Sequence, residues 1–123
     1  MAKTKTNKPI VSAKRWARLQ PFLKRREVRQ RLMLYLLAAD YTVGELVTLK
    51  RKALRSLSLH PDMVTARDEL FELFPAGELA FVFPSGNAMK HTNIYRIIRT
   101  ATQIVTGVGM SQEQLREYLD KKQ

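Results

Sequence analysis

The chain has 123 residues, a formal net charge of +11, no cysteine and a hydrophobic content of 45%. A chain of this length buries one modest core, and without cysteine it has no disulfides, no thiolate metal ligands and no cysteine nucleophile. It also lacks an apolar run of 18 residues and a secretory leader, so we expect a cytoplasmic protein with no membrane span.

The positive charge is concentrated at the start of the chain. Residues 1–31 hold eleven Lys or Arg against one acid, Glu27, which gives +10, whereas the remaining residues carry +1. This asymmetry is typical of an arm or face that binds a polyanion, and a solubilising tail is the alternative. We expect residues 1–11 to be a basic flexible arm and residues 12–123 to be one helical domain.

The first half of the chain predicts three helices. Ser12 is a suitable N-cap for a short helix that Pro21 kinks or ends. Trp16 in that helix is expected to pack in the core, with stacking on a nucleobase as the alternative. Residues 25–39 predict a helix with one apolar face, and residues 43–49 a short helix that the basic run 50–52 closes.

The second half continues the helical pattern after a weak strand signal at residues 54–59. Pro61 and Asp62 suit a helix start, with a core stripe of Met63, Ala66, Leu70, Phe71 and Phe74. Residues 80–83 read as extended. Residues 92–106 have the clearest helical period, with Ile94, Ile97, Ile98, Ala101, Ile104 and Val105 as the core stripe.

The ends of the last two helices are also predicted. Gly107 suits the residue after a helix end, and Ser111 with Gln114 predicts a capping box for a final helix. The expected fold is therefore mainly α, a small single domain of about five to six helices with a short residual β element.

Four segments in order resemble motifs of the tyrosine-recombinase (phage-integrase) catalytic domain. Residues 38–49, AADYTVGELVTL, resemble "TGLR-hydrophobic-SEL-x-x-L", and residues 57–61, LSLHP, resemble a "hydrophobic-P-L-P" strand exit. Residues 81–86, FVFPSG, resemble "Y-L-F-P-S-x-x-G", and residues 111–117, SQEQLRE, resemble "S-P-H-D-L-R-H". The resemblance covers residues 10–118 and implies a truncated domain of that family.

The same resemblance implies that catalysis is lost. The family's first catalytic arginine falls on Thr42, which cannot form a bidentate charged clamp on phosphate. Arg116 takes the place of the second catalytic arginine, but Glu113 replaces the histidine. The hairpin lysine is expected to be absent, the sequence ends before the family's nucleophilic tyrosine, and Tyr118 is too close to Arg116 to replace it. We therefore expect no enzyme.

In the family, a helix start enters the DNA major groove, and this helix corresponds to residues 92–106. Its leading edge and two further basic groups supply the candidate DNA contacts, with an ordinary solvated face as the alternative. Arg116 is expected either to bind phosphate or to pair with Glu113 or Asp120. The candidates are Lys14, Arg15, Arg18, Lys24, Arg25, Arg26, Arg29, Lys50, Arg51, Lys52, Arg55, Lys90, His91, Thr92, Asn93, Tyr95, Arg96, Arg99 and Arg116.

The expected function is non-catalytic DNA binding in a mobile element, as a transcriptional regulator or an accessory factor of site-specific recombination. The expected partner is double-stranded DNA, with a second copy of the chain or a tyrosine recombinase as further partners. The alternative function is a protein-interaction module that docks on an active tyrosine recombinase. No metal or other cofactor is expected, because His60 and His91 lie in unrelated segments and no glycine-rich phosphate loop is present.

Overall fold

The computed structural model describes residues 11–24, 26–74, 77–82, 87 and 89–121, and these residues form a mainly helical domain. The expected arm lies almost entirely outside them, as do Arg25 and Phe83. Seven helices are present in the described part: α1 (Ala13–Leu23), α2 (Val28–Ala38), α3 (Val43–Thr48), α4 (Arg51–Ser56), α5 (Pro61–Leu73), α6 (His91–Thr106) and α7 (Gln112–Asp120). The predicted fold class is confirmed, with one or two more helices than expected.

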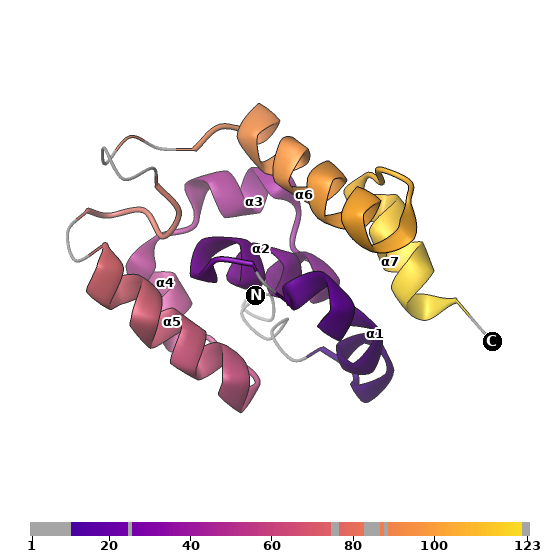
Figure 1. The fold of residues 1–123 in the computed structure, drawn as a ribbon. Helices are drawn as coiled ribbons and strands as arrows, with labels where there is room; N and C mark the ends of the chain where they lie inside the picture. The colour runs from indigo at the N-terminus through magenta and orange to yellow at the C-terminus, as the bar shows by residue number, and fades with distance from the viewer. Residues whose placement is uncertain (1–10, 25, 75–76, 83–86, 88, 122–123) are drawn as a thin grey trace, which may run out of the picture.

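Helix α2 lies at the centre of the domain (Figure 1). Helix α5 packs on one side of it, and α1 and α7 pack on another. Every residue from Leu32 to Ala39 is buried, so the prediction of a single apolar face was incomplete. A helix that is surrounded on all sides buries its whole circumference, and the 3.6-residue period then marks only part of its core.

Local capping chemistry explains most of the helix starts. The Ser12 hydroxyl accepts a hydrogen bond from the Arg15 N–H at 3.2 Å, and Ser111 forms the predicted capping box with Gln114. Gly107 ends α6 with φ 86°, in the left-handed region that glycine adopts without a steric penalty. These three predictions are confirmed.

Helix α5 has a less common cap. Pro61 is its first residue, as predicted, and the His60 Nδ1 accepts a hydrogen bond from the Asp62 N–H at 3.1 Å. The Trp16 ring stacks on the His60 ring at 3.8 Å and meets the Tyr35 ring edge-on at 5.8 Å. Trp16 therefore joins α1 to the start of α5, which is the packing role predicted for it.

The predicted strand at residues 54–59 is wrong, because residues 51–56 form α4. Ala, Leu, Lys and Arg dominate this segment and are strong helix formers. Leu54 is its one fully buried residue, and Leu57, three positions later, is half-buried. The β element is instead an antiparallel bridge between Lys50 and Leu79, with backbone bonds from Arg51 N–H to Glu78 O and from Ala80 N–H to Leu49 O.

The extra helix also corrects the predicted place of the basic run. Arg51 and Lys52 lie in the first turn of α4 and do not close α3, which ends at Thr48.

Ile104, predicted as core, is 64% exposed near the end of α6, because the described chain has no element covering that side of the helix.

Candidate nucleic-acid interface

Arg15 is a structural residue that joins three segments. Its guanidinium forms a bidentate pair with the Asp120 carboxylate, at 2.7 and 2.6 Å, and donates to the Ala38 carbonyl and to the Asp40 carboxylate. The hydrogen bonds to Asp120 raise the pKa of Arg15 above its ordinary value, and the same bonds lower the pKa of Asp120. The side chain is only 17% exposed, so Arg15 holds α1, α2 and α7 together.

Arg116 takes a matching position at the same end of α2. Its guanidinium donates to the carbonyls of Leu37 and Tyr41 and lies 3.7 Å from the Asp40 carboxylate. Neither of the predicted pairings, with Glu113 or with Asp120, is formed. The last carbonyls of a helix carry partial negative charge and have no intrahelical donors, which explains why two guanidiniums gather there.

The turn that follows α2 depends on these two arginines. Asp40 adopts φ 74°, a left-handed conformation that is uncommon for a residue other than glycine. The Tyr41 N–H donates to Leu36 O and the Asp40 N–H to Leu37 O, which is the hydrogen-bond pattern of a Schellman helix end. The ion pairs from Arg15 and Arg116 stabilise Asp40 in this position.

Other predicted DNA-contact arginines also have partners inside the fold. Arg29 donates to the Val82 carbonyl, pairs with Glu27 and lies over the Phe74 ring. Arg51 donates to the Phe74 carbonyl at the end of α5. Arg51 and Arg55 both lie over the Phe71 ring, with guanidinium carbons 4.4 and 4.9 Å from its centroid. Phe71 and Phe74, predicted in the core stripe of α5, are half-buried: they pack against the core and also lie under these guanidinium groups.

The remaining basic candidates differ in how strongly they are held. Lys14 donates to Asp120 O, Arg18 to Tyr118 O, and Arg26 to the Gln30 side chain at 3.4 Å. Lys50 pairs with Glu78 across an exposed surface. Lys24 and Lys52 are exposed, and their ammonium groups form no hydrogen bond or ion pair in the described part of the chain. The structure thus separates cations that hold the fold from cations that face solvent.

Helix α6 carries a long polar face on which several of the predicted residues gather. Ile94, Ile98, Ala101 and Thr102 point into the core, and the opposite side is exposed. Tyr95 is 43% exposed, and Arg96 and Arg99 are exposed, with guanidinium groups that form no hydrogen bond or ion pair with any described residue. The helix has 16 residues and is therefore about 24 Å long, enough to lie along a DNA groove.

The start of α6 packs beside α3. The Asn93 side chain accepts a hydrogen bond from the Lys90 N–H at 2.9 Å, so its oxygen is used to cap the helix. The His91 Nε2 lies beside Gly44 of α3, 3.5 Å from the position that a Cβ there would take. Lys90, His91 and Thr92 are exposed at this corner. The predicted leading edge of the helix is thus accessible, although the side-chain oxygen of Asn93 already accepts a hydrogen bond that caps α6.

Thr42, the position that the resemblance compares with the first catalytic arginine, has a structural role in this fold. The Thr42 hydroxyl accepts from the Glu45 N–H, and the Glu45 carboxylate accepts from the Thr42 N–H, which completes a capping box for α3. The motif's glycine, two positions earlier, falls on Asp40. Tyr118 is 37% exposed, and its ring meets Phe22 edge-on at 5.6 Å.

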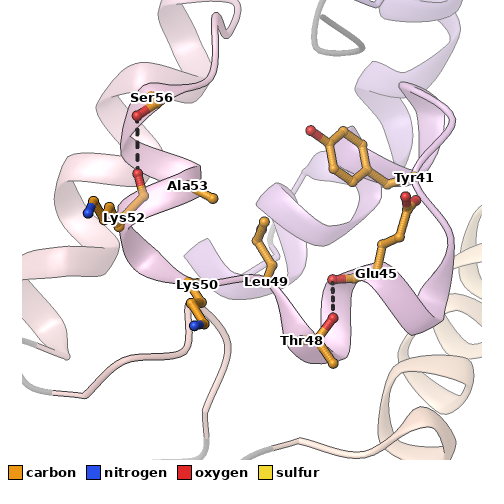
Figure 2. A pocket seen from close by; sticks show the side chains of 8 residues that line it. All are labelled: Tyr41, Glu45, Thr48, Leu49, Lys50, Lys52, Ala53 and Ser56. Atoms are coloured by element: carbon orange, nitrogen blue, oxygen red, sulfur yellow. Dashed lines mark hydrogen bonds between the residues drawn. The ribbon is translucent and has the colours of Figure 1, made fainter. Parts of the chain in front are cut away.

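A hollow of about 510 Å³ between α3 and α4 was missed at the sequence level. Figure 2 shows Tyr41 and Glu45 on one side, Lys52, Ala53 and Ser56 on the other, and Leu49 between them. Burial, followed by the charge of Glu45, raises the pKa of Tyr41 above its usual range. No sequence signal points to this site, because the sharp turn at Leu49 brings its two walls together.

Comparison of the chain with protein-family models, with curated proteins and with solved structures finds no match. Among the described residues, no helix has both the length and the apolar character that crossing a bilayer requires. The same residues contain no group of three or more His, Asp or Glu placed to bind a metal ion.

Proposed function

We propose that the protein binds double-stranded DNA through the exposed face of α6 and does not cut or join it. The observation that carries this proposal is the gathering of Tyr95, Arg96 and Arg99 on one solvent-facing side of a long helix. Arginine in the major groove donates two hydrogen bonds to a guanine edge, and tyrosine and threonine bond phosphate or base edges.

The charge of the chain supports the same proposal. The net charge of +11 favours association with a polyanion and steers it over distances near the Debye length. Arg15, Arg29, Arg51 and Arg116 have partners inside the fold, so the proposal rests on Lys90, Arg96, Arg99, Lys24 and Lys52. Residues 1–9 contribute three further lysines outside the described residues.

The absence of catalysis is part of the proposal and rests on the recombinase resemblance. Thr42 stands where the motif has an arginine, and its hydroxyl caps α3. Glu113 stands where the motif has a histidine. The left-handed backbone of Asp40, at the position of the motif's glycine, supports the alignment of residues 38–49 and with it the assignment of Thr42. A non-cutting regulator or recombination accessory factor of a mobile element is the role that fits these features.

The test is an electrophoretic shift assay with duplex DNA at two salt concentrations. Each neutralised phosphate lowers log affinity by about 0.9 per decade of salt, so binding through several cations gives a steep slope. The double variant Arg96→Ala/Arg99→Ala should lose most of the affinity. Lys121→Ala is the matched control, because it removes an exposed charge at the end of α7.

Two results would reject this assignment. Affinity that does not change with salt would exclude an electrostatic interface, and unchanged affinity in the double variant would exclude α6. Deleting residues 1–9 separates the contribution of the start of the chain, since this deletion should flatten the slope while the domain remains folded.

The second candidate function is docking on an active tyrosine recombinase. The observation that favours it is a hollow beside α7 that is lined by two exposed apolar residues, Val108 (60% exposed) and Tyr118 (37% exposed), with Ile104 (64% exposed) near the end of α6. Exposed apolar patches of this kind commonly mark protein interfaces. Co-purification with a recombinase that Val108→Asp abolishes, in a protein without DNA affinity, would favour this candidate over the first.

A further inference from the structure

We propose that Gly109 is a positioning residue, which holds the Arg99 side chain as a fixed clamp for a backbone phosphate of the bound DNA. The inference rests on the proposed function, because it assigns a role within the α6 interface. It adds to that interface a backbone contact from the loop between α6 and α7, residues 107–111.

The two glycines of this loop serve different purposes. Gly107 has φ 86°, and a Cβ added there would meet no atom of the described residues within 4 Å. Gly109 does not have a left-handed backbone, yet a Cβ added there would lie 2.5 Å from Arg99 Cγ and 3.3 Å from Arg99 Cδ. Real Cβ atoms essentially never come so close to another heavy atom. Glycine at position 109 therefore provides space for the Arg99 stem and not a special backbone conformation.

The loop is tied to α6 on both sides of Gly109. The hydroxyl of Thr102, a fully buried residue, accepts a hydrogen bond from the Met110 N–H at 2.8 Å. The Thr106 hydroxyl accepts a hydrogen bond from the Val108 N–H at 3.2 Å. These bonds hold the backbone of Gly109 in place, so the surface that it presents to the neighbouring side chain is fixed.

Arg99 is thus held at its stem and free at its head. Its guanidinium is exposed and forms no hydrogen bond or ion pair with any described residue. A side chain that is ordered before binding loses less rotamer freedom when it meets its ligand, which corresponds to binding about threefold to tenfold tighter. Orientation matters for arginine in particular, because its planar fork donates to two phosphate oxygens at once.

The position of Arg99 along α6 favours a phosphate over a base edge. Arg99 lies in the middle of the helix, three residues and about 4.5 Å after Arg96. Helices that read the major groove contact base edges mainly with their first residues, whereas later parts of the helix contact the DNA backbone. A phosphate contact by Arg99 fixes the register in which Arg96 meets the bases.

The contact itself is tested without DNA. In NMR spectra of the free protein, nuclear Overhauser effects should connect the α protons of Gly109 with the γ protons of Arg99, because the backbone lies against this stem. Absence of these effects would overturn the proposal, whatever the protein binds.

Gly109→Ala tests the role in binding. It should weaken duplex binding about threefold to tenfold, and specific and random duplex alike, because the added methyl group displaces the Arg99 stem. In the Arg99→Ala background the same substitution should change affinity by less than about twofold, because no stem is left to displace. Thermal melting checks that all variants are folded.

Three binding results would overturn the proposal. An equal loss in both backgrounds would show that the loop acts independently of Arg99, and unchanged affinity of Gly109→Ala would show that Arg99 needs no support. A change in the ratio of specific to random binding would assign Arg99 to base edges. All three leave DNA binding by α6 intact, whereas wild-type protein that does not bind duplex would reject the proposed function as well.

Discussion

The end of α2 and the exposed face of α6 use the same side chain for opposite purposes. At the end of α2, Arg15 and Arg116 donate to backbone carbonyls and to the carboxylates of Asp40 and Asp120. On α6, Arg96 and Arg99 are exposed, and their guanidinium groups have no hydrogen-bond or ion-pair partner among the described residues. The positive charge counted along the sequence therefore overstates the charge that remains available to a ligand. Partnering within the fold decides which arginines remain for a ligand.

The largest expected effect lies at the end of α2. Arg15→Ala leaves the Ala38 carbonyl without this donor and removes the bidentate bond between α1 and the Asp120 carboxylate, so the free energy of unfolding should fall by about 2–3 kcal/mol. Urea denaturation measures this change. Arg96→Ala is the control and should stay within about 0.5 kcal/mol of the wild type. Equal effects of the two substitutions would remove the distinction between the two regions.

Arg116→Ala extends the same test to a shared partner. Alone it should cost about 2 kcal/mol, since the carbonyls of Leu37 and Tyr41 each lose a charged donor. Combined with Arg15→Ala, the total loss should differ from the sum of the single losses, because both guanidiniums contact Asp40. A double-mutant cycle by urea denaturation measures the coupling, and strict additivity would argue against a common site.

The exposed face of α6 gives the next effect, which is on binding and not on stability. Arg96→Ala should cost about 1–3 kcal/mol at a specific DNA site and relax discrimination between bases, whereas Lys90→Ala should weaken all sequences alike. Competition shift assays with specific and random duplex separate the two. If Arg96→Ala alters neither affinity nor site preference in a folded protein, α6 is not the reading helix.

The Arg15–Asp120 pair predicts a smaller, pH-dependent effect. Because the pKa of Asp120 is lower in the folded chain, the pair stabilises fully above the ordinary aspartate pKa of 3.8 and loses this contribution as the pH falls further. Asp120 is about half exposed, so the contribution should stay below about 1 kcal/mol. Asp120→Asn should lower stability at pH 6 and reduce its fall between pH 4 and 2, as followed by thermal melting.

For DNA cleavage and joining, we expect no effect at all. Incubation with supercoiled plasmid should leave its topology unchanged and give no covalent adduct, because Thr42 and Glu113 provide neither the phosphate clamp nor the histidine of the motif. Gel electrophoresis with and without protease treatment checks both outcomes. Thr42→Arg should not restore cleavage and should lower stability, since it removes the hydroxyl that caps α3. A covalent adduct in either protein would contradict the non-catalytic proposal.

The sequence by itself determined the helical class and most of the helix ends. Ser12, Gly107 and the Ser111–Gln114 pair act through bonds to neighbours within three or four residues, and Pro61 acts through its own fixed φ, so local sequence is enough to predict them. The same holds for the Ile94, Ile98 and Ala101 stripe, because the side of α6 that packs on the core is continuous. The exposed polar face on the other side of α6 follows from that stripe.

Only the tertiary structure decided which charges are used internally. Arg15 and Asp120 are separated by 105 residues, and Arg116 and Leu37 by 79. No periodic pattern connects such positions, and a guanidinium has the same sequence signature whether it binds a carbonyl or faces water. The hollow between α3 and α4 depends in the same way on the turn at Leu49. The sequence pattern predicted the end of one helix there, whereas the structure has a junction between two helices. Local chemistry determines where the helices form, whereas contacts between residues distant in sequence determine which charged side chains stay exposed and unpaired on the surface.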